Sequence, residues 1–429
     1  MTEAVLLVGG QGTRLRPLTV NTPKPMLPVA GVPFTVHQIT RARDAGVERI
    51  VLATSYRAEV FAEFIEDADL GIEVVIATEE EPLGTGGAIR HALNHLESGP
   101  DDPILIFNGD VLSGLDIAGL VRSHVETSSD VTLYLTPVED PRAYGLVPID
   151  TDGRVQAFLE KPSTPEEIVT DLINAGCYVF TRSVIEQIPA GRVVSVERET
   201  FPGLLSGGAH VRGVVDRGYW LDLGTPLAFV QGSRDLVIGI APSPAVPDTG
   251  QALVLHGAQV AASAHVGGGT SVGRDVVVAA DAMVDGSVLF DGAVIEMGAH
   301  VTGSIIGAGA RIGEGSVLEG VVVGDGAVVG ARNELREGAR VWPGVELPDL
   351  HPVFQRRLGA HSIAPNRSGL CSRAHVAVAD PSPPARERRL RRLPTVALGH
   401  RGRTGHARST ARISSKKSTL NRVLPLIVG

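Results

Sequence analysis

A glycine-rich segment near the N-terminus carries the residues best suited to chemistry. Residues 8–19 read VGGQGTRLRPLT, and residues 23–28 read PKPMLP. Glycines let backbone N–H groups approach a ligand closely, and a turn of such groups can cradle phosphate oxygens. Arg14, Arg16 and Lys24 add cations, while the prolines fix φ and stiffen the loop. The segment predicts a preorganised clamp for a polyphosphate, lined by Gly9, Gly10, Gly12 and Thr13.

Other glycine-rich loops fit this segment less well. A Walker A loop needs a Gly-Lys pair, and the chain contains none. A dinucleotide fingerprint needs a third glycine where Leu15 stands. A ligand-free strand-to-helix turn would require neither the cations nor the prolines. We therefore favour a phosphate-binding loop of a different type.

Alternating elements position this loop over roughly the first 239 residues. An apolar run, residues 4–8, predicts a buried strand directly before the glycines. Strand and helix patterns then alternate, with helices expected at 34–45, 58–66 and 86–96 and strands at 48–53, 72–77, 103–107, 131–136, 155–159, 173–180 and 211–215. Such repeats predict a Rossmann-like α/β domain with a mixed, mostly parallel sheet, whose ligands bind at the carboxyl ends of the strands.

A six-residue period appears beyond a proline-rich linker at residues 240–251. Apolar residues recur in three registers over 252–348: Val260, Val266, Val272, Val278, Val284 and Phe290; then Val288, Val294, Ile306, Ile312 and Leu318, interrupted by His300; then Val323, Val329, Leu335, Val341 and Leu347. Such hexads predict a parallel β-helix whose apolar residues point inward. The pattern resembles the left-handed β-helix of hexapeptide proteins. The two register shifts suggest short loops leaving the coils.

Composition narrows the class of protein further. A chain of 429 residues that is 43% hydrophobic can hold two or three domains with large cores. No membrane span or secretory signal is expected, and Cys177 and Cys371 imply no disulfide framework, so we expect a cytoplasmic protein. β-Helices bury their core by stacking coils, and we expect a homo-oligomer formed through this domain or the α/β domain.

The C-terminal segment, residues 349–429, differs sharply in charge. Residues 350–429 carry 14 Arg, 2 Lys and 2 acidic residues, a net charge of +14, whereas the preceding residues carry 23 basic and 46 acidic groups, a net charge of −23. One interpretation is a disordered basic arm that binds nucleic acid. We favour a reading-frame change in GC-rich coding DNA, because the segment lacks a patterned Lys/Arg run with aromatics.

The glycine-rich segment resembles the signature of the sugar-1-phosphate nucleotidylyltransferases. The resemblance covers residues 1 to about 349. It implies that a sugar 1-phosphate attacks the α-phosphate of a nucleoside triphosphate and releases pyrophosphate. Asp110, in the sequence FNGD, and Asp222, in YWLDLGT, match the aspartates with which the family binds Mg²⁺. Carboxylates, phosphate oxygens and water are the ligands that this cation prefers.

Further motifs match the family's catalytic and sugar-binding residues. Arg14 matches the arginine that stabilises charge on the transferring phosphate, and Lys24 is expected to grip the triphosphate. Lys161, in FLEKP, matches the lysine that holds the incoming phosphate. The resemblance implies that the sugar hydroxyls contact a further set: Tyr144, Gly145, Glu160 and Asn174.

The segment EEEPLGTGGA, residues 79–88, is expected to bind the nucleoside through Glu79, Glu80, Gly84 and Thr85. Relatives that use uracil or thymine carry a glutamine where Glu79 stands. A carboxylate only accepts hydrogen bonds, and guanine presents N1–H and N2–H₂ side by side. We therefore expect GTP, with Glu79 as the first reader of the base and Glu80 as the second.

The narrower resemblance is to bacterial, particularly actinobacterial, mannose-1-phosphate guanylyltransferases. It is carried by PLGTGG and by SVERE at residues 195–199, and it implies mannose 1-phosphate as the second substrate. A uridylyl- or thymidylyltransferase acting on glucose 1-phosphate is the alternative enzyme. A non-catalytic scaffold or sensor would have lost Arg14, Lys24 or an aspartate, all of which are present. Acyl transfer by the repeat domain has no residue cluster to support it.

Overall fold

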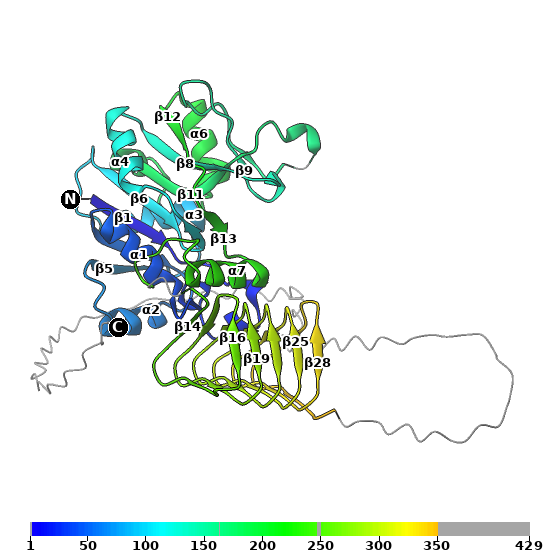
Figure 1. Ribbon diagram of the computed structural model, residues 1–429. Coiled ribbons are helices and arrows are strands. Elements are labelled where there is room, and N and C mark those ends of the chain that lie inside the picture. Colours follow the sequence, from blue (N-terminus) through cyan, green and yellow to red (C-terminus); the bar gives the residue numbers. More distant parts are fainter. Residues whose placement is uncertain (1, 163, 247–249, 351–429) are drawn as a thin grey trace, which may run out of the picture. The chain divides into compact units, whose positions relative to one another are not determined.

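The computed structural model describes residues 2–162, 164–246 and 250–350. They form an α/β domain followed by a β-helix (Figure 1). Within these ranges no helix is both long and apolar enough to cross a membrane. Most of the C-terminal segment, and residues 247–249 of the linker, lie outside the described residues, as do the predictions made for them.

A nine-stranded sheet forms the centre of the α/β domain. Its main path runs β10-β9-β11-β6-β1-β4-β5, with β8 pairing β11 and β12. Strands β6, β1, β4 and β5 are mutually parallel, whereas β11 runs antiparallel to β6 and β8. The strands are β1 (Thr2–Leu7), β4 (Val47–Thr54), β5 (Glu73–Thr78), β6 (Pro103–Asn108), β8 (Val131–Pro137), β9 (Gly145–Leu146), β10 (Leu159–Glu160), β11 (Leu172–Thr181) and β12 (Val211–Val215). The predicted mixed, mostly parallel sheet is confirmed.

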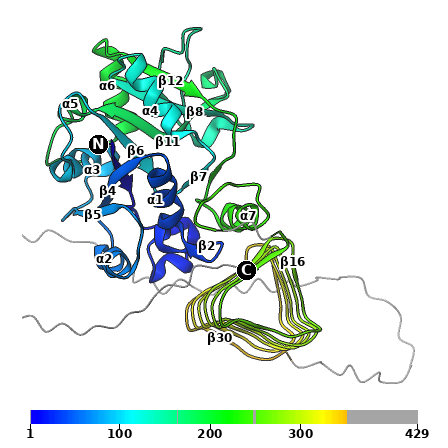
Figure 2. The same ribbon diagram turned by 60° about the vertical axis from the view of Figure 1, so that its left-hand side comes forward.

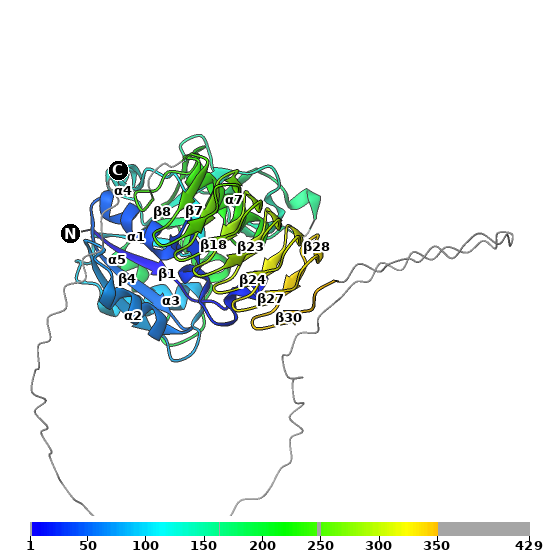
Figure 3. The ribbon, with the colours of Figure 1, turned by 60° about the horizontal axis from the view of Figure 1, so that its bottom comes forward.

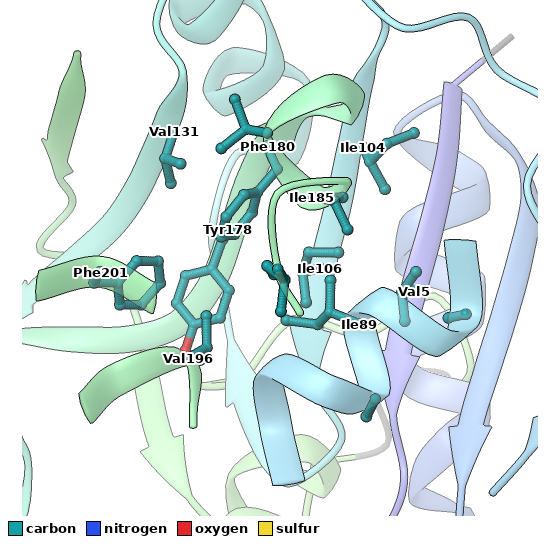
Figure 4. Close-up of a cluster of buried hydrophobic side chains, with 14 of the residues drawn as sticks. Val5, Ile89, Ile104, Ile106, Val131, Tyr178, Phe180, Ile185, Val196 and Phe201 are labelled. Carbon is teal, nitrogen blue, oxygen red and sulfur yellow. The ribbon is translucent and has the colours of Figure 1, made fainter. Parts of the chain in front are cut away.

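Helices cover both faces of this sheet. They are α1 (Phe34–Asp44), α2 (Ala58–Asp67), α3 (Gly84–Ala92), α4 (Ile117–Glu126), α5 (Arg182–Ile185), α6 (Phe201–Ser206) and α7 (Pro226–Val237). Alternate residues of β1 serve the two faces: Val5 packs with α3, α5 and α6, whereas Ala4 and Leu6 pack with α1, α2 and α4. Figure 4 shows the first of these cores, with Tyr178 and Phe180 of β11 beside Phe201.

Several elements differ from the sequence prediction. The strand expected at 155–159 is reduced to β10 and two isolated bridges, because the side chain of Asp150 accepts hydrogen bonds from the N–H groups of Asp152 and Arg154 and closes a tight turn. Helices α4 and α7 were not predicted. Both begin at residues whose side chains cap the helix: Asp116 accepts from Gly119 N, and Thr225 accepts from Ala228 N.

The β-helix consists of three parallel sheets, seen as the sides of a triangle in Figure 2. The first sheet contains β14 (Ala252–Val254), β17 (Thr270–Val272), β20 (Val288–Leu289), β23 (Ile305–Ile306), β26 (Val322–Val323) and β29 (Arg340–Val341). The second contains β15 (Gln259–Val260), β18 (Val277–Val278), β21 (Val294–Ile295), β24 (Arg311–Ile312), β27 (Val328–Val329) and β30 (Glu346–Leu347). The third contains β16 (His265–Gly267), β19 (Met283–Asp285), β22 (His300–Thr302), β25 (Val317–Glu319) and β28 (Glu334–Arg336). Its predicted handedness stays a prediction.

The register shifts of the repeat have a different cause from the predicted one. Val260 pairs with Val278, 18 residues on, but Ile295 pairs with Ile312, only 17 residues on. The central coils are thus one residue shorter than three hexads, and the strands stay in register without loops leaving the coils (Figure 3). Leu289 therefore points inward rather than Val288 or Phe290, and Ile295 points inward rather than Val294. Val301 points inward next to His300, the residue that interrupts the predicted register.

One face of the β-helix packs against the α/β domain. Outward-facing residues of the first sheet lie in register from coil to coil; this outer ladder consists of Leu253, Ser271, Val288, Ile305, Val322 and Arg340. Its apolar members share a core with Leu15, Leu27 and Phe229. Ser271 Oγ lies 3.1 Å from Ser233 Oγ of α7. Helix α7 lies between the two domains in Figure 1, and the outer ladder runs along the surface where the domains meet.

Candidate active site

The carboxyl ends of β1, β4, β5 and β6 meet at one edge of the sheet, and the predicted site residues follow them. The glycine loop follows β1, Glu79 follows β5, and Asp110 lies two residues after β6. Gly109 allows β1 and β6 to end together, since a Cβ there would lie 2.5 Å from the carbonyl oxygen of Leu7. The sheet therefore places three separate segments around one space.

The glycine loop turns into the short helix η1 (Thr13–Leu15) through a left-handed residue, Gly12, with φ of 56°. A side chain at Gly12 would lie 2.9 Å from Cβ of Lys24, so glycine lets the loop close onto the lysine segment. Thr19 Oγ1 donates to the carbonyl oxygen of Gly12 over 2.9 Å, and Leu15 is fully buried. These two contacts anchor the turn to the domain. Gly9 and Gly10 remain exposed toward the site.

Two carboxylates and two cations converge at this edge. Strand β13 (Trp220–Asp222) pairs with β7 (Val111–Ser113), so that Asp222 lies beside Asp110. Lys24 Nζ lies 2.8 Å from Asp110 Oδ2 and 3.8 Å from Asp222 Oδ1. Arg14 Nη2 lies 3.8 Å from Asp222 Oδ2, and its side chain is 64% exposed, which leaves it free to meet a ligand.

The electrostatics of Asp222 fit a divalent cation. Its Oδ1 is buried and has no hydrogen-bond partner among the described residues. Burial raises the pKa of Asp222 and the neighbouring Asp110 carboxylate raises it further, whereas the charges of Lys24 and Arg14 oppose this rise only in part. Over residues 2–162, 164–246 and 250–350, no three His, Cys, Asp or Glu side chains gather as a metal-binding group. A cation here would combine the two carboxylates with phosphate oxygens and water.

Three adjoining cavities surround these groups. A cavity of about 350 Å³ is lined by Gly9, Gly10, Gly12, Thr13, Arg14, Lys24, Thr85 and Asp110. A second, of about 320 Å³, adds Glu79 and Gly84 to an apolar wall formed by Leu7, Ala53, Tyr56, Pro82 and Ala88. The two cavities share Leu7, Gly9, Gly10 and Thr85 and therefore adjoin each other.

Glu79 lies on the wall of the second cavity and is buried. Its Oε2 accepts a hydrogen bond of 2.8 Å from Leu83 N, which orients the carboxylate. Glu80 is exposed and lines none of these cavities, so the structure separates it from Glu79. Gly86 and Gly87 of the same segment are buried against Val194, whose carbonyl oxygen accepts from both N–H groups.

The third cavity, of about 530 Å³, gathers the remaining predicted residues. It is lined by Tyr144, Gly145, Glu160, Lys161 and Asn174 together with Arg14, Asp110 and Asp222. Lys161 Nζ lies 3.5 Å from Glu160 Oε1, and its side chain is 59% exposed. Asn174 is oriented by Tyr178, because its Nδ2 donates to Tyr178 Oη over 2.8 Å. Arg14 and Asp110 lie on both this cavity and the first.

Two residues of the third cavity were not singled out from the sequence. Glu197 lines it and accepts hydrogen bonds of 2.8 Å from Thr85 Oγ1 and Ser195 Oγ. It therefore links the helix that begins at the second cavity to the wall of the third. Trp220 packs edge-on against Tyr144, with ring centroids 5.3 Å apart. The SVERE segment was the available signal for Glu197, but spacing alone does not place it here.

Known protein families match both domains of the chain. Residues 3–237 match the family described as "Nucleotidyl transferase", and residues 249–348 match the "GMPPB C-terminal domain". The chain is 54% identical over 350 residues to a mannose-1-phosphate guanylyltransferase of Mycobacterium tuberculosis, covering 81% of this chain and 96% of the relative. It is 40% identical over 233 residues to the mannose-1-phosphate guanylyltransferase catalytic subunit beta of Drosophila pseudoobscura pseudoobscura, covering 54% of this chain and 61% of that protein.

A solved structure, HddC from Yersinia pseudotuberculosis, is 31% identical in sequence and covers 55% of this chain and 99% of its own, with a TM-score of 0.48. The family match spans more than half of the chain, and the Mycobacterium relative is covered almost completely. This chain belongs to the nucleotidyl transferase family.

Proposed function

We propose that this chain transfers a guanylyl group from GTP to mannose 1-phosphate, giving GDP-mannose and pyrophosphate. The observation that carries the proposal is the position of Arg14 and Asp110 on the border between two cavities. One of these continues to Glu79, and the other is lined by Glu160 and Lys161. The 54% identity to a mannose-1-phosphate guanylyltransferase supports this choice of substrates.

The nucleotide occupies the first two cavities in this proposal. Its base rests on the apolar wall formed by Leu7, Ala53 and Ala88, and Glu79 accepts the N1–H and N2–H₂ groups of guanine. The Leu83 N–H donates to one carboxylate oxygen of Glu79, so this carboxylate is already oriented when the base binds. The triphosphate lies along the glycine loop toward Lys24, where Gly9, Gly10, Gly12 and Thr13 leave the backbone open.

The sugar phosphate occupies the third cavity. Lys161 provides a point charge for its phosphate, while Glu160, Asn174 and the backbone of Gly145 contact the hydroxyls. Tyr144 forms an apolar wall with Trp220 against the sugar ring. We add Glu197 to this set, because its carboxylate lies on the same cavity and is already oriented by Thr85.

The reaction is a displacement at phosphorus. An oxygen of the sugar phosphate forms a bond to the α-phosphorus of GTP while the bond to the bridging oxygen of pyrophosphate breaks. The nucleophile is already ionised at neutral pH, so the protein supplies position and charge rather than a general base. Arg14 donates to the transferring phosphate as charge develops there, and Lys24 neutralises the triphosphate.

Asp110 and Asp222 would hold Mg²⁺, because a hard cation prefers carboxylate oxygens and keeps water and phosphate ligands. When bound, it neutralises phosphate charge and orients the reacting groups. The buried Oδ1 of Asp222, which accepts no hydrogen bond within the described part of the chain, supports this assignment. The same substrates favour the cytoplasmic location expected from the sequence.

Pyrophosphate release across GTP, UTP, dTTP and ATP, each with mannose and glucose 1-phosphates and Mg²⁺, tests the proposal. We expect GTP with mannose 1-phosphate to give the highest kcat/KM. Replacing Glu79→Gln should lower kcat/KM for GTP by roughly 10- to 100-fold, because a guanine donor then faces an amide N–H. Glu80→Gln is the matched control and should change little. Preferred turnover of UTP or dTTP would overturn the choice of base.

A further inference from the structure

Arg340 of the β-helix contacts the backbone of the glycine loop directly. It lies on β29, the last strand of the first sheet, more than three hundred residues after the loop. Its Nη2 donates a 3.0 Å hydrogen bond to the carbonyl oxygen of Arg14, and its Nη1 donates to the carbonyl oxygen of Arg16. One guanidinium therefore bridges two carbonyl groups on either side of Leu15.

The local sequence explains why the loop needs an external donor. In a turn of helix η1 the carbonyl of Arg14 would be satisfied by the N–H group three residues later. That residue is Pro17, which has no N–H. A carbonyl near a charged site without a donor would lose a hydrogen bond and the rigidity that comes with it. Arg340 supplies this donor from another domain.

The outer ladder explains how Arg340 reaches this position. The ladder members Val288, Ile305 and Val322 are buried in the core shared with Leu15 and Leu27. Arg340 continues the same register one coil further on. The parallel pairing of the sheet thus delivers the guanidinium at the place where the apolar contact ends and the polar backbone of the loop begins.

Arg14 depends on its backbone for its position. Its side chain is mostly exposed, and its contact with Asp222 Oδ2 is as long as 3.8 Å. In the described part of the chain, the β-helix contacts the carbonyl groups of Arg14 and Arg16 through the two hydrogen bonds that Arg340 donates. An arginine that stabilises a developing charge must keep its guanidinium in a precise position relative to the reacting phosphate. A displacement of about 1 Å can lower a rate by up to a hundredfold.

We propose that Arg340 is a positioning residue for nucleotidyl transfer, holding the backbone of the Arg14 loop from the β-helix. The proposal rests on the proposed function, because it assigns Arg14 to the transferring phosphate. It makes the β-helix part of the active-site framework, although its residues do not line the substrate cavities described above.

Steady-state kinetics of the full chain test the proposal with three variants. Arg340→Ala should lower kcat about tenfold and change KM for GTP and mannose 1-phosphate by less than about twofold, since Arg14 acts on the transition state. Arg340→Lys should restore little, because an ammonium lacks the planar fork that spans two carbonyls. Arg336→Ala is the control: Arg336 pairs with Glu319 on another sheet of the β-helix.

A double-mutant cycle separates positioning from a general loss of structure. In an Arg14→Ala background, Arg340→Ala should have almost no further effect on kcat. An equal loss of kcat in both backgrounds, or an unchanged kcat in Arg340→Ala alone, would overturn the proposal. Turnover by the wild-type chain tests the proposed function separately, because the cycle can be run with whichever substrate pair is used.

Hydrogen exchange provides a readout that does not require turnover. Arg340→Ala should accelerate amide exchange in the peptide that contains Thr13–Leu18, and Arg336→Ala should leave it unchanged. Equal exchange in wild type and Arg340→Ala would contradict the proposed support of the loop even for a chain without activity.

Discussion

Aspartates in the two domains differ in the hydrogen bonds that their side-chain oxygens accept. In the β-helix, Asp291 and Asp325 lie at coil corners, where Oδ1 of each accepts a backbone hydrogen bond from the preceding coil, at Arg274 and Ala308 respectively. In the α/β domain, Asp222 is partly buried beside Asp110, and its Oδ1 accepts no hydrogen bond from the described residues. The first pair completes the fold, whereas the second pair leaves acceptors for a ligand. Residue type alone therefore does not distinguish a structural aspartate from one at the site, whereas the hydrogen bonds that its oxygens accept do.

The largest expected effect comes from Asp222, whose Oδ1 accepts no hydrogen bond from the described residues. Asp222→Asn should lower kcat roughly a thousandfold, equivalent to about 4 kcal/mol, because one anionic oxygen donor for the cation is lost. In metal-free buffer it should not lower the thermal midpoint, since the change removes repulsion with Asp110. Pyrophosphate release and thermal unfolding measure the two effects. Asp325→Asn is the control, and retention of more than a tenth of wild-type kcat by Asp222→Asn would break the comparison.

A buried histidine of the α/β domain makes the stability of the fold depend on pH, which extends the comparison to a satisfied polar group. The fold uses both ring nitrogens of His37: Nδ1 lies 2.7 Å from Ser243 Oγ and Nε2 lies 2.9 Å from the carbonyl oxygen of Val29. Burial lowers the pKa of His37 to about 4 from 6.5. The unfolded chain therefore binds the proton more readily, so this contribution to stability is present above pH 6.5 and is lost as the pH falls toward 4.

The loss attributable to His37 should be on the order of 3 kcal/mol across this range. Urea unfolding at pH 7 and at pH 4.5 measures it, and His37→Gln should flatten the pH dependence. Burial also lowers the pKa of His124 to about 4, so a residual slope should remain in the variant. An identical slope in wild type and His37→Gln would contradict this interpretation.

A corner aspartate of the β-helix should affect stability alone. Asp325→Ala removes the acceptor for Ala308 N and should lower the free energy of unfolding by about 1 kcal/mol. Asp325→Asn keeps an acceptor and removes a carboxylate whose pKa is raised by burial, so it should cost less. Denaturant unfolding ranks the two variants, and a fall in kcat for either would show that this corner is coupled to the site.

The smallest effect is expected for an exposed ion pair of the β-helix. Arg311 Nη1 lies 3.3 Å from Glu296 Oε1, and the arginine side chain is 55% exposed. Solvent screens such pairs, so Arg311→Ala should change the free energy of unfolding by less than about 0.5 kcal/mol and leave kcat unchanged. A change above about 1 kcal/mol, measured by denaturant unfolding, would mean that paired surface charges also stabilise this domain.

Much of the architecture could be predicted because the relevant signals are local. Strands β1, β4, β5 and β6 follow apolar runs, and the hexads predict a β-helix. Helices α4 and α7 were missed although Asp116 and Thr225 are recognisable caps. The central coils are one residue shorter than three hexads, so a strict period of six selected Phe290 where Leu289 points inward.

The site was harder to predict, because it depends on contacts between distant segments. The motifs identified Asp110 and Asp222, but only the pairing of β7 with β13 brings them side by side. Glu197 reaches its cavity through a hydrogen bond to Thr85, and Arg340 reaches the glycine loop through the register of six coils. No spacing within one segment could indicate either contact.

The outer ladder also fixes a length. Ser271 meets helix α7 at one point of the contact, and Arg340 meets the glycine loop at another, four coils later. Adjacent parallel strands lie about 4.8 Å apart, so these two anchors are separated by about 19 Å along the coil axis. Removing one whole coil would keep the inward packing pattern of the remaining coils and yet leave the guanidinium one strand short of the loop. The number of coils in the β-helix therefore sets the distance between these two contacts, and it matters as much for the position of Arg340 as any single residue of the domain.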